Sequence, residues 1–123
     1  MKIKLLAAAL LAIAPLGTAQ AMDVATFLVK ADSVEKKGML ALMSSDYKLL
    51  MGEIRTQGAA LRAERLAAER ARRKPAYCPP AKQSLTAQEV LAAFRTIPAA
   101  KRPRIQVKEA LRALMARKYP CRA

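Results

Sequence analysis

The chain has 123 residues, two cysteines, no histidine and a net charge of +14 at neutral pH. Its length favours one small domain, and the missing histidine removes the commonest general base and the commonest metal ligand. The nine acidic residues are scattered, and the sequence contains no glycine-rich phosphate loop and no cluster of metal ligands. The composition therefore predicts a basic protein that is not an enzyme and that uses no metal or cofactor.

The first 21 residues have the pattern of a secretory signal peptide. Two early lysines precede an apolar run from Leu5 to Leu16, and Ala19 and Ala21 occupy the small-residue positions of a cleavage site. The apolar run has about 12 residues, whereas a membrane-spanning helix needs roughly 20. We expect cleavage after Ala21, export to the periplasm, and a single mature domain of residues 22–123. Loss of the two early lysines lowers its net charge to +12.

Two helices are predicted in the first half of the mature chain. The first begins after the N-cap Asp23 and runs to Lys36, and Gly38 can adopt the left-handed conformation that ends it. The second begins at Ser44. The apolar link between them, Met39–Met43, contains two methionines. We expect this link to be buried as core filler rather than exposed as a binding surface.

The second helix changes character along its length. Its apolar face fades after Leu61, and residues 59–74 are rich in alanine and basic side chains. We therefore expect a basic helical arm that leaves the body of the protein before Pro75. Gly52 and Gly58 weaken the helix unless they permit close packing or a bend. Two interpretations of the arm stay open: an ordinary solvated helix surface, or a docking site for an acidic partner.

Two further helices follow a proline-rich connection at residues 75–80. The third has the best-specified start in the chain, because Thr86 and Glu89 have the spacing of a capping box. It stops at Pro98. A basic loop leads to the fourth helix, at residues 105–118, where apolar residues again recur at helical spacing. The short loop between these helices favours an antiparallel hairpin.

The two cysteines, Cys78 and Cys121, flank this hairpin. An even pair in a small exported domain usually forms a structural disulfide. A metal site would need more ligands, and a redox pair is normally close in sequence. The bond would close a loop of about 40 residues, which chain-entropy arguments value at about 4 kcal/mol. The predicted fold is all-α: a small four-helix domain with a C-terminal helical hairpin closed by a disulfide.

The same region resembles a known family. Four short motifs follow one another in order: Cys78-Pro79-Pro80, Leu85–Val90, Ala110-Leu111 and Tyr119-Pro120-Cys121. This series of motifs resembles that of the Rap/Tai-type immunity proteins of type VI secretion. The resemblance implies a small, exported, all-helical protein that binds and blocks a toxin in the periplasm, typically an enzyme that cleaves peptidoglycan peptides. The matching positions are helix caps, core residues and cysteines, so no inhibitory residue follows from the resemblance.

Net charge is the remaining physical signal, since a basic domain attracts acidic proteins and polyanions. Nucleic acid is disfavoured as a partner by the signal peptide and by the shortage of aromatic side chains for base stacking. We expect an exported protein partner with an acidic surface. The candidate partner-binding residues are Arg62, Arg65, Arg70, Arg72, Arg73 and Lys74 in the arm, and Lys101, Arg102 and Arg104 in the basic loop.

A function of a different class is the alternative. In it the chain is a basic structural protein of the envelope that adheres to anionic lipid or cell-wall polymer through its charge. Peripheral contact with the envelope would then be its role. Self-association into a homo-oligomer is compatible with both functions.

Overall fold

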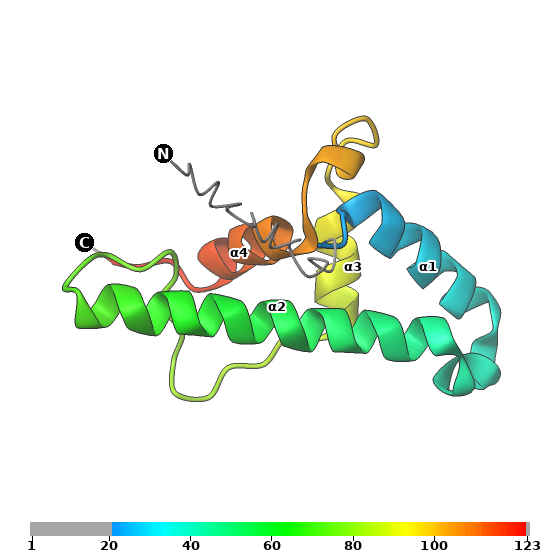
Figure 1. Cartoon of the computed structure of the whole chain (residues 1–123), viewed down its shortest axis with the longest axis horizontal. Coiled ribbons are helices and arrows are strands. Elements are labelled where there is room, and N and C mark those ends of the chain that lie inside the picture. The colour runs from blue at the N-terminus through cyan, green and yellow to red at the C-terminus, as the bar shows by residue number, and fades with distance from the viewer. Residues whose placement is uncertain (1–20, 123) are drawn as a thin grey trace, which may run out of the picture.

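One long helix, α2, runs the length of the protein, and α1 and α4 pack against it (Figure 1). The computed structural model describes residues 21–122. The elements are, in order, α1 Val24–Lys36, the 3-10 helix η1 Gly38–Met43, α2 Ser45–Arg70, α3 Ala87–Arg95, the 3-10 helix η2 Arg102–Arg104, and α4 Val107–Lys118. The prediction of an all-α domain with four main helices is confirmed.

The predicted signal peptide, apart from its last residue, Ala21, lies outside the described residues. In the part of the chain that the structure does describe, none of the helices combines the length and the apolar character that crossing a bilayer requires.

Local sequence signals set the helix starts. The Asp23 carboxylate accepts a hydrogen bond at 2.7 Å from a backbone N–H three residues on, and the Ser44 hydroxyl accepts one in the same way at 3.0 Å. Both halves of the predicted capping box form at α3. The Thr86 hydroxyl accepts from the Glu89 N–H at 3.1 Å, and the Glu89 carboxylate accepts from the Thr86 N–H at 2.7 Å. These bonds satisfy backbone donors that the first turn of a helix leaves free.

The apolar stripes of all four α-helices meet in one core. The rings of Phe27 and Phe94 pack edge to face, with centroids 5.2 Å apart. Burial of each large apolar side chain contributes roughly 1.5–3 kcal/mol. The buried residues are Val24, Phe27, Leu28, Ala31, Leu50, Leu61, Tyr77, Val90, Phe94, Val107, Ala110, Leu111 and Met115.

The predicted disulfide is present. Cys78 and Cys121 are bonded, with Cα atoms 4.9 Å apart. The Cys78 backbone N–H also donates to the Tyr119 carbonyl at 2.8 Å. The bond therefore joins the connection that follows α2 to the segment that follows α4, and it closes the α3–α4 hairpin. Tyr77, next to it, is only 4 % exposed.

A contact that the sequence did not predict holds the start of α1 against the start of α4. The Val24 N–H donates to the Ile105 carbonyl, and the Val107 N–H donates to the Met22 carbonyl, each at 2.9 Å. The two bonds form an isolated antiparallel bridge. Because the backbone at Ile105 is extended to make this bridge, α4 begins at Val107 and not at residue 105.

The prediction that Met39–Met43 is buried is wrong. Met39 and Met43 are 96 % and 82 % exposed, and Leu40 and Leu42 are 70 % and 65 % exposed. The segment forms η1, which turns the chain from α1 into α2 at one end of the molecule (Figure 1). It lies beyond α3 and α4, so these helices do not cover it.

The segment predicted as a solvated arm, residues 59–74, divides into two parts. Its first part packs on the body of the protein, because Leu61 is 2 % exposed and the Arg65 side chain is 15 % exposed. The helix ends at Arg70, and the exposed residues from there to Lys74 form a turn. The helix therefore stays on the body of the protein as far as Arg65, further than a solvated arm over residues 59–74 would.

Replacing both cysteines with serine should lower the free energy of unfolding by about 4 kcal/mol, because the unfolded chain then loses its cross-link. Urea unfolding of the wild type, with and without a reductant, and of the double variant measures this effect. The reduced wild type should match the double variant. Equal stability of all three samples would contradict a structural role for the bond.

Gly52→Ala and Gly58→Ala should each stabilise the protein by up to about 1 kcal/mol, because alanine is the better helix former. A Cβ added at either position meets no atom within 4 Å, so close packing does not require these glycines. Gly38→Ala is the matched control. A Cβ there also has space, but φ is +55° as predicted for the end of α1, so alanine should destabilise. Thermal unfolding distinguishes the two cases, and a lower melting temperature in Gly52→Ala would refute the argument.

Candidate functional site: a basic recess at the end of the long helix

The C-terminal part of α2 and the connection after it enclose a recess of about 150 Å³, which we call the basic recess. Three cations and one carboxylate are among the residues that line it, so its charge is positive. The lining residues come from α2, the connection and α4: Leu61, Glu64, Arg65, Ala68, Lys74, Pro75, Ala76, Tyr77 and Arg112.

At the end of α2 the chain reverses direction, so that the residues after the helix line this recess. The Arg73 N–H donates to the Ala68 carbonyl at 2.8 Å, and the Arg72 N–H donates to the Glu69 carbonyl at 3.1 Å. This pair of bonds is a Schellman motif, in which the residue at the Arg72 position takes the left-handed conformation. Arg72 has a φ of 55°. The turn then directs Lys74 to the recess.

Glu64 joins α2 to α4 beside the recess. Its carboxylate pairs with Lys108, and it accepts a hydrogen bond from Nη2 of Arg112 at 2.9 Å. The hydrogen bonds from Lys108 and Arg112 lower the pKa of Glu64 below its ordinary value of 4.5. The acidic group in the recess is therefore already neutralised by two cations of α4.

Arg65 connects the recess to the disulfide. Its Nη1 pairs with Glu69 at 3.1 Å, and its guanidinium carbon lies 5.8 Å from the centroid of the Tyr77 ring. Its Nε is buried and has no hydrogen-bond partner among the described residues. Since Tyr77 precedes the bonded Cys78, the disulfide holds the aromatic surface on which Arg65 rests.

The turn after α2 adds an excess of positive charge next to the recess. Arg70, Arg72, Arg73 and Lys74 are all exposed. Within residues 21–122, none of them forms an ion pair. Of the nine predicted partner-binding residues, Arg65 and Lys74 line the recess, and Arg70, Arg72 and Arg73 lie at the helix end that leads to it. Arg62 is also exposed on α2 but lines a neighbouring hollow.

The predicted residues of the basic loop lie elsewhere. Lys101 and Arg104 are exposed at η2, which is far from the end of α2 in Figure 1. Arg102 makes contacts within the protein: its Nε donates to the Ile97 carbonyl and its Nη2 to the Arg95 carbonyl, both at 2.8 Å. Those carbonyls lie at and just beyond the end of α3, so Arg102 satisfies acceptors that the helix leaves free.

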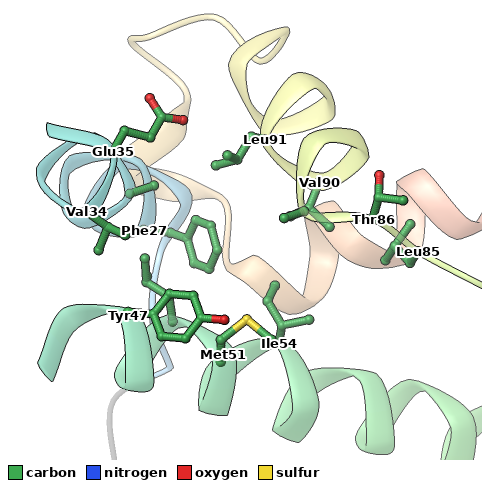
Figure 2. A pocket seen from close by; sticks show the side chains of 13 residues that line it. Phe27, Val34, Glu35, Tyr47, Met51, Ile54, Leu85, Thr86, Val90 and Leu91 are labelled. Atoms are coloured by element: carbon green, nitrogen blue, oxygen red, sulfur yellow. The ribbon is translucent and has the colours of Figure 1, made fainter. Parts of the chain in front are cut away.

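A second hollow, which the sequence did not predict, is an apolar groove of about 190 Å³ between α1, α2 and α3. Figure 2 shows Phe27 of α1, Tyr47 and Met51 of α2, and Val90 of α3 around it. Helical spacing predicts that these residues face inward. Whether their side chains fill the space between the three helices depends on the distances between those helices. The spacing of apolar residues along the sequence does not give these distances.

A third hollow, of about 350 Å³, shares lining residues with both the apolar groove and the basic recess. It shares Ile54 and Leu85 with the apolar groove, and Leu61 and Tyr77 with the basic recess. One face of α2 therefore borders a series of hollows that is apolar near its start and basic near its end. Such a surface suits a partner segment with apolar and acidic parts.

No group of three or more histidine, cysteine or carboxylate side chains that could hold a metal ion occurs among residues 21–122. The fold and the site together define a small, disulfide-closed, all-α protein with a basic recess.

Comparison with known protein families, curated proteins and solved structures finds no match. The resemblance to immunity proteins thus stays a prediction from the sequence.

Acid should weaken the link between α2 and α4. Because the folded pKa of Glu64 is lowered, its ion pairs contribute stability above pH 4.5, and this contribution is lost as the pH falls through the lowered value. Glu64→Gln should reduce stability at neutral pH by less than about 1 kcal/mol, as expected for exposed pairs.

Melting temperatures across the acid range should show the difference between Glu64→Gln and the wild type shrinking as the pH falls. Glu109→Gln is the control, since Glu109 forms no ion pair among the described residues. A difference for Glu64→Gln that does not change with pH would contradict the assignment.

Proposed function

We propose that this chain is an exported, non-enzymatic binding protein that occludes a partner protein, as immunity proteins do, and that the basic recess is its docking site. One observation carries the proposal. Lys74 lines a recess that is itself positive, and three more exposed cations without a carboxylate partner among the described residues lie at the same helix end: Arg70, Arg72 and Arg73. An acidic segment of a partner would supply the missing negative charge.

The backbone at Arg72 supports this assignment. Its φ of 55° is a conformation that glycine adopts freely and that costs other residues about 1 kcal/mol. Strained backbone is often found at functional sites, where the side chain is needed despite its cost in stability. In the proposed complex, the guanidinium of Arg72 contacts an acidic group of the partner.

The proposed complex would depend on salt. Exposed charges interact over about 10 Å at 0.1 M salt and over much less at high salt. Charges at the rim of an interface mainly accelerate association and select against wrong partners. The apolar groove along the same helix would supply contacts that salt does not weaken. A toxin that cleaves peptidoglycan is the partner favoured by the sequence resemblance.

A matched pair of variants tests the proposal. Arg72→Gly/Arg73→Gln removes two cations beside the basic recess, and Lys101→Gln/Arg104→Gln removes two exposed cations elsewhere. The first variant should bind the partner at least about tenfold more weakly, while the second should bind like the wild type. Arg72→Gly alone should raise the free energy of unfolding by about 1 kcal/mol.

Capture from a periplasmic extract at low and high salt provides the partner, and titration of the purified partner measures the affinity. Cleavage of peptidoglycan by that partner should fall as the protein is added. Equal losses in both double variants would instead indicate adhesion through net charge, which is the alternative function of an envelope protein. Failure to retain any partner at low salt would refute the proposed function.

A further inference from the structure

The end of the molecule opposite the basic recess is an exposed apolar tip, formed by Met39, Leu40, Leu42 and Met43 of η1 (Figure 1). All four side chains are more than half exposed. Soluble proteins rarely leave several large apolar residues together in water unless the surface binds something. None of the four lines the apolar groove, so the tip is a separate surface.

Cations flank this tip. Lys36 and Lys37 precede η1 directly, and Lys48 lies in the first turn of α2. All three are exposed, and none forms an ion pair in the described part of the chain. An apolar surface bordered by free lysines is complementary to a layer whose interior is apolar and whose outer face is negatively charged.

The acidic residues of this region are already engaged. Asp46 pairs with Lys30 at 3.3 Å. Asp32 and Glu35 both pair with Arg95 of α3, at 3.1 and 3.0 Å. The hydrogen bonds that Arg95 donates to Glu35 and Asp32 raise the pKa of Arg95, which agrees with mutual neutralisation. The charge left around the tip is therefore positive.

We propose that the apolar tip inserts into the surface of an anionic lipid bilayer, with Lys36, Lys37 and Lys48 at the level of the headgroups. A projecting tip needs no preformed cavity when its neighbour is fluid, and methionine and leucine adapt readily to lipid chains. Interfacial segments typically enter about 5–10 Å, a depth that one turn of 3-10 helix can reach. A second copy of the chain is a poorer neighbour, because its lysines would face like charges.

Attachment at the tip leaves the basic recess free. The 26 residues of α2 span about 39 Å, and the tip and the recess lie at its two ends (Figure 1). A partner held at the recess would thus be kept away from the bilayer. The inference goes beyond the proposed function and does not require it, because the two surfaces have no residue in common.

Vesicle binding tests the inference with the processed protein purified from the periplasm. The probes are vesicles of phosphatidylglycerol with phosphatidylethanolamine, and vesicles of phosphatidylcholine alone. The wild type should sediment with the anionic vesicles only. Replacing Met39, Leu40, Leu42 and Met43 with serine should reduce the partition coefficient by about tenfold or more. Lys36→Gln/Lys37→Gln/Lys48→Gln should reduce it more than Arg70→Gln/Arg72→Gln/Arg73→Gln, which removes the same charge at the other end.

A spectroscopic readout keeps the test valid if the serine variant fails to fold. The chain contains no tryptophan, so a single introduced tryptophan reports on its own surroundings. Leu42→Trp should shift its emission to shorter wavelength with anionic vesicles, while Ala71→Trp, at the exposed end of α2, should not.

Three results would overturn the inference. They are no sedimentation of the wild type with anionic vesicles, no emission shift for Leu42→Trp, or an equal fall in the partition coefficient for the triple lysine variant and the triple arginine variant. A dimer of the wild type in lipid-free solution that becomes a monomer in the serine variant would also overturn it, since a second copy would then cover the tip. The serine variant and the triple lysine variant should keep their affinity for the partner of the basic recess. Failure of the inference is therefore distinguishable from failure of the proposed function.

Discussion

The Cys78–Cys121 bond is the constraint on which the C-terminal half of the protein depends. It ties the connection after α2 to the segment after α4, and the backbone hydrogen bond from Cys78 to Tyr119 reinforces the same junction. Tyr77, one residue before the bond, is buried and supports the guanidinium of Arg65. The cross-link therefore holds together a small domain and also shapes one side of the recess proposed as its docking site.

The ion pairs determine which of the many cations stay without a carboxylate partner among the described residues. Glu64 engages two cations of α4, the acidic residues near the end of α1 engage Arg95, and Asp46 of α2 engages Lys30. These pairs use the scarce carboxylates where helices meet. The cations without such a pair include those of the turn after Arg70 and those around η1, and also Lys101 and Arg104 at η2. The shortage of acidic residues thus leaves free positive charge at both ends of α2, where the two proposed binding surfaces lie.

Features set by neighbouring residues or by covalent chemistry were predictable from the sequence. The capping box at Thr86 needs only a spacing of three residues, and the disulfide needs only two cysteines in an oxidising setting. Features set by distant elements were not. The exposure of Met39–Met43 depends on how far α3 and α4 reach, and the engagement of Arg102 by two carbonyls depends on where its loop folds back. The apolar groove likewise depends on helix separation and not on helix periodicity.

The backbone bridge between Met22–Val24 and Ile105–Val107 has a consequence for biogenesis. If the chain crosses the membrane from its N-terminus, as the sequence predicts, α1 arrives first and its bridging partner arrives almost last. The bridge must then wait for nearly complete translocation, although α2, which follows α1 directly, can cover part of the apolar face of α1 earlier. Closure of such a distant contact is slow compared with helix formation. The bridge and the bond to Cys121 would therefore both close only after nearly the whole chain has emerged.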